Sequence, residues 1–223
     1  MVYKSNKNAQ EQKEMKKKLI LDTAAQLFVN RGYHNTSVKD IVEQASISVG
    51  SFYFYFTSKD ELLESLYDEM NDTFLNVLQD VYIDFEEALI YGLSKAIVNT
   101  LVLFQNNQDL SKILLNNSIS TGPLFEKRRM DNNQRFYKIV EEIIRNLSNK
   151  SLIKCENVEV AAMTIMGGIF FMISNLLETN FELKMIPNYS YSVISYHLRA
   201  LSVDFNEAEL LKNIDQIIQE QGD

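Results

Sequence analysis

The chain has few residues that interrupt helices, with seven Gly and two Pro among 223 residues. A sandwich or barrel needs many tight turns, so this shortage argues against an all-β fold and favours long helices. A single cysteine, Cys155, excludes an internal disulfide and a cysteine-pair metal site, and it is typical of a protein in a reducing cytoplasm. The two histidines, His34 and His197, argue against a histidine-rich metal site or a catalytic triad.

The sequence also lacks the common signatures of enzymes. A P-loop, an HExxH motif and a GxSxG motif are all absent, so we predict no catalytic residue, no cofactor and no metal. The pair Gly167-Gly168 falls in the middle of an expected helix, where it cannot cradle a phosphate. An enzyme that uses Cys155 beside Lys154 as a reactive thiol remains an alternative, although an incidental cysteine is the simpler interpretation.

The longest run without a charge extends from Val160 to Leu177, and its 18 residues are at the lower limit for a membrane span. Polar side chains interrupt it, and Glu159 and Glu178 flank it where a span usually has basic anchors. We therefore predict no membrane insertion. A helix buried on most sides, in a bundle core or a subunit contact, is the preferred interpretation.

Charge is distributed unevenly around a net value of -8. Residues 1–60 hold nine Lys and Arg against six Asp and Glu, whereas residues 61–223 hold 13 against 24. A net charge of +3 on the first part and -11 on the second suggests that the amino-terminal end contacts a polyanion. A chance excess of a few lysines is the alternative.

Apolar residues recur at helical spacing along the chain, and no alternating pattern is long enough to predict a strand. Ile20, Ala24 and Phe28 share one face of a helix that ends before Gly32. Ser58 with Glu61 has the pattern of a capping box and begins a long helix. Further helices are predicted at about 84–104, 110–115, 122–147, 158–178, 189–203 and 207–219, the last capped by Asn206 or Asp204.

The segment from Thr36 to Lys59 has the pattern of a helix-turn-helix, at about residues 36–56. Ser37 with Asp40 caps a first short helix, Ser46-Ile47-Ser48 forms the turn, and a second short helix follows from Val49. Four apolar residues can pack the two helices together, namely Ile41, Ala45, Ile47 and Phe52. This leaves small and aromatic side chains on the outer side of the second helix, where they could enter the major groove of DNA.

A string of residues in this region resembles the amino-terminal domain of the TetR (tetracycline-repressor) family of bacterial transcriptional regulators. The resemblance extends from Ala25 to Leu62, roughly 40 residues of 223. One departure is Ser46, where the family usually has Gly; we expect the turn to form, because Ser adopts a positive φ at a cost of about 1 kcal/mol. The shared positions are Ala25, Leu27, Phe28, Gly32, Tyr33, Thr36, Ser37, Val38, Asp40, Ile41, Ala45, Ser48, Gly50, Phe52, Tyr53, Tyr55, Phe56, Lys59, Glu61 and Leu62.

The resemblance implies an all-α fold with two domains. Residues 1–60 would form a three-helix helix-turn-helix domain that binds DNA, and residues 61–223 a larger helical bundle that binds an effector and dimerises. It also implies a set of DNA contacts, with Lys39 and Ser37 at the groove edge. The recognition helix has no arginine for a bidentate guanine contact, so readout would depend on Lys39, on thymine methyl groups and on DNA shape. The implied DNA-binding residues are Ser37, Lys39, Ser48, Val49, Gly50, Ser51, Tyr53, Phe54, Tyr55 and Lys59.

The implied partners are a near-palindromic double-stranded DNA operator, a second copy of the chain and an unknown small-molecule effector. The uncharged helix at 158–178 supports a homodimer, with the helix at 189–203 as its neighbour in a four-helix contact. We predict a cytoplasmic repressor that a small, largely apolar ligand releases from its operator. A helical interaction or sensor protein with a vestigial helix-turn-helix is the alternative. The candidate dimer residues are Met163, Gly167, Phe171 and Tyr196, and the candidate ligand-binding residues are Phe104, Phe136, Met166 and Phe170.

Overall fold

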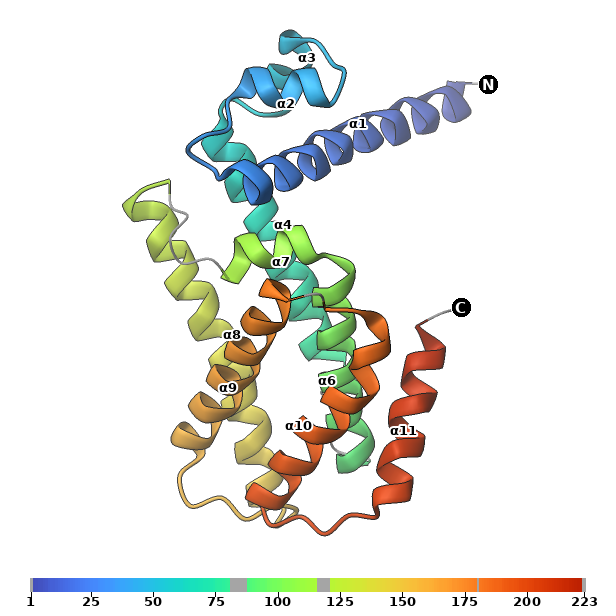
Figure 1. Ribbon diagram of the computed structural model, residues 1–223, viewed down its shortest axis with the longest axis vertical. Coiled ribbons are helices and arrows are strands. Elements are labelled where there is room, and N and C mark those ends of the chain that lie inside the picture. Colours follow the sequence, from blue (N-terminus) through green and yellow to red (C-terminus); the bar gives the residue numbers. More distant parts are fainter. Residues whose placement is uncertain (1, 81–87, 116–120, 180, 222–223) are drawn as a thin grey trace.

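A computed structural model describes residues 2–80, 88–115, 121–179 and 181–221, and it contains helices and no strand in these ranges. The predicted all-α fold class is confirmed. Figure 1 shows a small amino-terminal unit at one end of a longer helical body. The elements are α1 (Val2–Arg31), α2 (Val38–Gln44), α3 (Val49–Tyr55), α4 (Lys59–Asp80), α6 (Leu89–Asn106), α7 (Gln108–Leu115), α8 (Pro123–Asn149), α9 (Val158–Glu178), the 3-10 helix η1 (Leu183–Met185), α10 (Ile186–Ala200) and α11 (Glu207–Glu220).

Helix boundaries agree with the sequence wherever a polar cap is present. Helix α9 has the predicted bounds, and Asn157 Oδ1 accepts the amide hydrogen of Val160 at 3.0 Å. Asn206, not Asp204, caps α11, because its Oδ1 accepts the amide hydrogen of Ala208 at 2.9 Å. Helix α10 begins at Ile186, earlier than predicted, since a proline in the first turn is already held in helical φ. The start predicted near residue 84 lies outside the described residues, and α6 is described from Leu89.

Helix α1 is longer than the apolar pattern predicts, because it begins at Val2 and extends for 30 residues. Its first half projects beyond the rest of the amino-terminal unit (Figure 1). That half has no apolar face, so periodicity could not reveal it, but Lys, Glu and Gln are good helix formers. The helix ends where predicted, with Gly32 at a φ of 84°.

The amino-terminal unit has its own core, in which Phe28, Ile41 and Phe52 are almost fully buried. Three residues from the start of α4 complete it, namely Leu62, Leu63 and Leu66, and Ile113 of α7 packs against it from the body. Because α4 continues without a break, this core is joined directly to the larger one. The domain boundary at residue 60 therefore stays a prediction.

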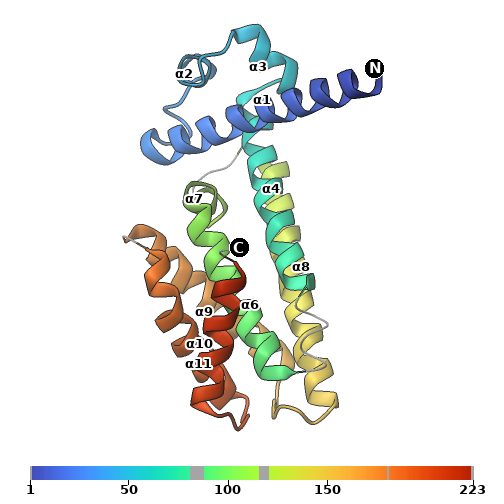
Figure 2. The same cartoon turned by 90° about the vertical axis from the view of Figure 1, so that its right-hand side faces the viewer.

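The body surrounds a cluster of phenylalanines from four helices. Phe74 of α4 packs against Phe104 of α6 at 5.7 Å and against Phe136 of α8 at 4.8 Å between ring centroids. Phe170 of α9 completes the cluster at 5.4 Å from Phe74. Figure 2 shows α4 and α8 side by side along the body, and α6 packs against α10 and α11. The lower half of α4 is thus fixed in the body core.

Helix α9 is less buried than the sequence suggests. Its length and composition would suit a membrane span, yet only 22% of its most apolar window is buried. Ala162, Ile173 and Leu177 face the core, whereas Met163 is 51% and Phe171 73% exposed. Burial on most sides is therefore wrong for a single chain, because the neighbouring helices cover one face of α9 and leave the other open.

Candidate nucleic-acid interface

The turn between α2 and α3 is built around Ser46, whose φ is 54°. The Ile47 amide donates to the carbonyl of Val42 at 3.0 Å, which closes the turn. The prediction that serine would take the positive φ usually supplied by glycine is confirmed. Phe52 is fully buried between the helices, so it holds α3 in place.

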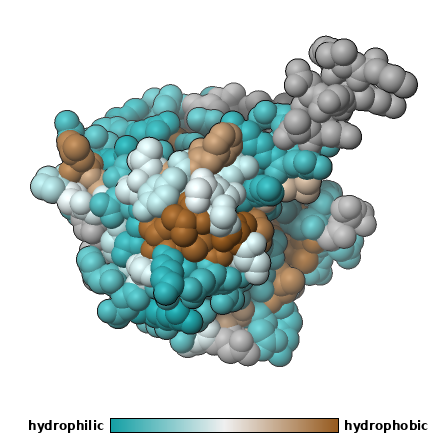
Figure 3. Space-filling view, turned by 90° about the horizontal axis from the view of Figure 1, so that it is seen from above, coloured by the Kyte–Doolittle hydropathy of each residue, from teal (hydrophilic) through white to brown (hydrophobic). Residues whose placement is uncertain are grey.

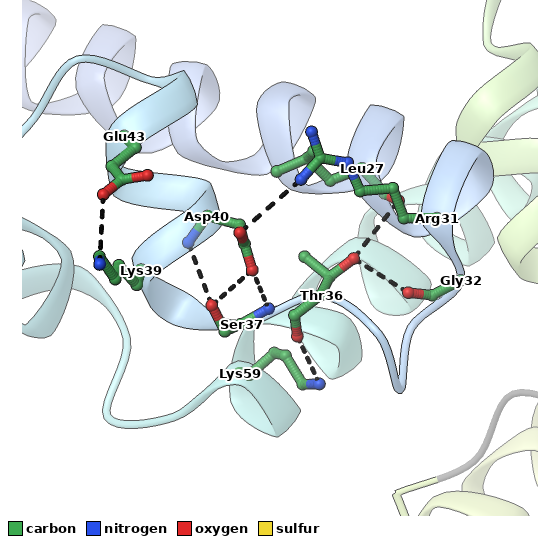
Figure 4. A network of polar contacts seen from close by, with 9 residues as sticks. All are labelled: Leu27, Arg31, Gly32, Thr36, Ser37, Lys39, Asp40, Glu43 and Lys59. Atoms are coloured by element: carbon green, nitrogen blue, oxygen red, sulfur yellow. Dashed lines mark hydrogen bonds and ion pairs between the residues drawn. The ribbon is translucent and has the colours of Figure 1, made fainter.

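The predicted capping box at the start of α2 is present (Figure 4). Ser37 Oγ accepts the amide hydrogen of Asp40 at 3.2 Å, and the Asp40 carboxylate accepts the amide hydrogen of Ser37 at 2.7 Å. Hydrogen bonds from Ser37 and the charge of Arg31, 3.7 Å away, lower the pKa of the Asp40 carboxyl. Ser37 therefore fixes the beginning of α2, and its hydroxyl is already engaged within the chain.

Lys59 has a structural role that sequence reasoning missed. Its ammonium donates to the carbonyl of Tyr33 at 2.7 Å and to that of Thr36 at 2.8 Å, and it lies 4.1 Å from the centre of the Tyr33 ring. Burial lowers its pKa. Thr36 Oγ1 in turn donates to the carbonyl of Gly32 at 2.9 Å. Lys59 thus ties the α1–α2 loop to α4, and two of its three ammonium hydrogens are engaged in these contacts.

The outer face of α3 is apolar and open. Val49 is 51%, Tyr53 53% and Phe54 68% exposed, although each is large and apolar enough to be buried in an ordinary domain. A Cβ added at Gly50 would meet no atom closer than Ser48 Oγ at 4.0 Å. The fold therefore does not require glycine at this position, whereas close approach of another molecule would benefit from it.

Lysines of α1 flank this face. The ammonium of Lys13 lies 5.3 Å from the centre of the Phe54 ring, and that of Lys17 lies 6.0 Å from the centre of the Phe56 ring. Figure 3, seen onto the end that bears α2 and α3, shows apolar side chains gathered within a mainly hydrophilic surface. An apolar ridge with cations beside it suits a groove whose walls are phosphates.

The structure places the ten predicted DNA-binding residues between the start of α2 and the start of α4. Seven are exposed, and Ser51, Tyr55 and Lys59 are partly buried. The four predicted dimer residues are exposed on α9 and α10, and the four predicted ligand-binding residues belong to the body core. In the part of the chain that the structure describes, no group of three or more His, Cys, Asp or Glu side chains could hold a metal.

Two hollows border α9 and α10. A groove of about 1010 Å³ between them is lined by residues that include Cys155, Tyr189 and His197. A small apolar cavity of about 90 Å³ lies behind it and shares Ile165 and His197 with the groove. His197 is only 8% exposed, and burial lowers its pKa, so the imidazole in this wall is neutral at physiological pH.

The region that forms this interface matches known regulators. Residues 20–66 match the family described as bacterial regulatory proteins, tetR family. The uncharacterized HTH-type transcriptional regulator YuxN of Bacillus subtilis is 47% identical over 64 residues, which are 28% of this chain and 22% of that protein. A second regulator of Bacillus subtilis, YerO, is 28% identical over 175 residues, which are 76% of this chain and 58% of that protein. The chain thus matches less than two thirds of the length of these relatives.

Solved structures of regulators share the fold. The MbdR regulator from Azoarcus sp. CIB superposes with a TM-score of 0.72 at 22% identity, covering 82% of this chain and 97% of that one. The transcriptional regulator FadR from Bacillus subtilis, solved in complex with stearoyl-CoA, gives a TM-score of 0.66 at 20% identity, covering 80% and 96%. At these identities the likeness shows a common fold and no more.

Proposed function

We propose, since this chain belongs to the tetR family of bacterial regulatory proteins, that it is a transcriptional regulator that binds specific sites on double-stranded DNA. The observation that carries the proposal is the outer face of α3. Its exposed Val49 and Phe54, beside the small Gly50, stand on a helix pair fixed by the Ser37 cap and by Lys59. A fold that buried its apolar residues for stability alone would not leave these exposed.

In the proposed complex α3 lies in the major groove. Gly50 lets the backbone approach the bases, and Val49 and Phe54 contact thymine methyl groups. Ser48, Ser51 and Lys39 lie at the groove edges, while Tyr53, Tyr55 and the free hydrogen of Lys59 reach phosphates. The lysines of α1 add attraction that does not depend on sequence.

We also propose that the chain acts as a homodimer through α9 and α10. Phe171 and Tyr196 are 73% and 68% exposed, and a Cβ added at Gly167 would meet no atom within 4 Å. The single chain therefore needs neither the small residue nor the open apolar side, but a second copy could pack closely against both. Two recognition helices about 34–36 Å apart would read a near-palindromic operator.

The regulation we propose is repression relieved by a small, largely apolar effector, in the cytoplasm. The phenylalanine cluster and the apolar cavity of the body support it, as does a relative of this fold that was solved with stearoyl-CoA. An effector that binds better to one arrangement of α4 shifts the population toward that arrangement. Since α4 belongs to both cores, its tilt sets the spacing of the two α3 helices.

Selection of bound sites from random duplex DNA by the purified full chain tests the proposal. We expect a near-palindromic consensus whose binding weakens steeply with salt, because several phosphate contacts release counterions. If the chain is instead a helical interaction or sensor protein with a vestigial helix-turn-helix, the selection should give no consensus sequence. Absence of binding to any duplex at low salt would contradict the proposed function.

A further inference from the structure

Three buried polar atoms at the junction of α4 and α8 have no hydrogen-bond partner among the described residues. They are the Tyr67 hydroxyl, Asn71 Oδ1 and Arg129 Nη1. Tyr67 and Asn71 are each 1% exposed, and the Arg129 side chain is 15% exposed. Leaving such groups unpaired costs free energy, so a cluster of them indicates a site that another molecule completes.

The three groups lie close together. Burial raises the pKa of the Tyr67 hydroxyl, whereas the neighbouring Asn71, Arg129 and Asn132 lower it, so their side chains lie beside this hydroxyl. Asn71 is further fixed, because its Nδ2 donates to the carbonyl of Tyr67 at 2.7 Å. Arg129 Nη2 pairs with Glu126, whereas its Nη1 has no partner among the described residues.

Arg129 also lines a hollow of about 410 Å³ between α8 and α9. Along α8 the side chains facing this hollow change from polar to apolar, from Arg129 and Asn133 to Phe136. Met166 and Phe170 of α9 line it too, and both also line the apolar cavity deeper in the body. Met166 and Phe170 therefore separate the hollow that Arg129 lines from an apolar cavity, and they border both.

Helix α4 repeats the same gradient. Tyr67, Asn71 and Phe74 are spaced by four and three residues and so share one face. The first two bear the unpaired polar atoms, and the third joins the phenylalanine cluster. The polar end of both helices points toward the DNA-binding unit, and the apolar end points away from it (Figure 2).

We propose that the effector is a single-chain amphipathic carboxylate, with its head group held by Arg129 Nη1 and the Tyr67 hydroxyl and its chain lying along Phe136, Met166 and Phe170. Two of the three unpaired groups are donors, and one donor is cationic, which favours a group that only accepts. The inference rests on the proposed function, because it names the chemistry of the effector proposed there. It links the ligand directly to α4.

Calorimetric titration of the full chain tests the head group with three probes of one chain length: sodium dodecanoate, dodecan-1-ol and dodecanoyl-CoA. We expect dodecanoate to bind at least about tenfold more tightly than the alcohol, since only the carboxylate accepts two charge-assisted hydrogen bonds. Arg129→Gln should remove this preference by weakening dodecanoate alone. Arg128→Gln is the matched control, because that neighbouring arginine pairs with Glu64 and Asp68 outside the hollow.

Tyr67→Phe keeps the assignment testable if loss of Arg129 impairs folding. The variant removes only an unpaired hydroxyl, so its thermal stability without ligand should equal or exceed that of the original chain. Its affinity for dodecanoate should fall by about fivefold or more, while its affinity for dodecan-1-ol stays unchanged. A purely structural role for Tyr67 would alter both affinities alike, which would overturn the assignment.

Binding of dodecanoyl-CoA without dodecanoate, or equal binding of dodecanoate and the alcohol, would overturn the carboxylate site. Operator binding is measured separately, by the salt titration of the selected duplex. If the chain binds its operator but shows no preference for dodecanoate, this inference is wrong and the proposed function still holds. If the chain binds dodecanoate through Arg129 but binds no duplex, the carboxylate site is supported and the proposed function is wrong.

Discussion

At the scale of single residues, the turn between α2 and α3 depends on one residue with a positive φ. Ser46 has a φ of 54°, where a side chain is strained. The Ser46→Gly variant should therefore raise the free energy of unfolding by about 1 kcal/mol, measured by urea denaturation. Ser65→Gly is the control, since Ser65 lies within α4 and glycine there should lower stability by about 0.5–1 kcal/mol. Equal effects at both positions would contradict the explanation.

Lys59 has a structural role in the loop and, in the proposed complex, a DNA-binding role, and two variants can separate the two roles. Lys59→Met should lower the free energy of unfolding by about 2 kcal/mol, because the carbonyls of Tyr33 and Thr36 lose a charged donor. It should also weaken binding to every DNA sequence by a similar factor. Tyr53→Phe should weaken DNA binding likewise but leave stability unchanged, since Tyr53 is exposed. If Lys59→Met unfolds no more easily than the original, the loop does not depend on this lysine.

The burial of His197 predicts that the stability of the chain depends on pH. Because burial lowers its pKa, the unfolded chain takes up a proton at a higher pH than the folded chain. Stability should be unaffected well above the unfolded pKa of about 6.5 and fall below it, by at most about 1.4 kcal/mol per pH unit. His197→Met should remove this fall in denaturation measured between about pH 7.5 and 5.5, whereas His34→Gln, at an exposed position, should keep it.

At the scale of helices, the proposed complex places both α2 and α3 in contact with DNA. Lys39 lies on the exposed side of α2, where Glu43 is its partner at 3.8 Å. Replacing it with alanine should change the consensus obtained by site selection, because the proposed complex places this cation at the edge of the major groove. Glu43→Ala is the control that removes the ion pair and keeps the lysine. An unchanged consensus for Lys39→Ala, with weaker binding throughout, would reassign Lys39 to a phosphate.

The helices that sequence predicted well are those with polar caps and an apolar face. Ser37, Asn157 and Asn206 each cap the helix that follows them, and each marks a start that was predicted within a residue. The first half of α1 could not be predicted in this way, because its sequence has no apolar face. The role of Lys59 was also hidden, since its partners are backbone carbonyls 26 and 23 residues away.

At the scale of the whole molecule, the open side of α9 should decide the oligomeric state. Phe171→Glu would place a charge within the proposed two-fold contact, so the variant should be a monomer in analytical ultracentrifugation. It should also lose most of its operator affinity, because one recognition helix alone reads half a site. Leu124→Glu is the control, since Leu124 is 85% exposed on α8. A Phe171→Glu dimer would exclude this face as the interface.

Larger surfaces were less accessible to sequence reasoning than local structure. Met163, Gly167 and Phe171 were predicted from an uncharged helix and Tyr196 from its expected neighbour, but the exposure of these residues follows only from the packing of α9 and α10. The group of unpaired polar atoms on Tyr67, Asn71 and Arg129 could not be predicted from the sequence. Tyr67 and Arg129 are 62 positions apart, and each resembles an ordinary helix-surface residue. Contacts between distant helices depend on how the bundle closes, which periodicity does not specify.

Helix α4 is buried in two cores. Leu62 and Leu66 belong to the core of the amino-terminal unit, and Phe74 and Leu78 belong to the core of the body. An α-helix turns by about 100° for each residue. One alanine inserted after Asn71 would therefore rotate one pair of buried residues relative to the other about the helix axis. The chain could then bury either pair in its core but not both. The rotation between these two sets of residues about the axis of α4 therefore determines whether both cores of the molecule can form at the same time.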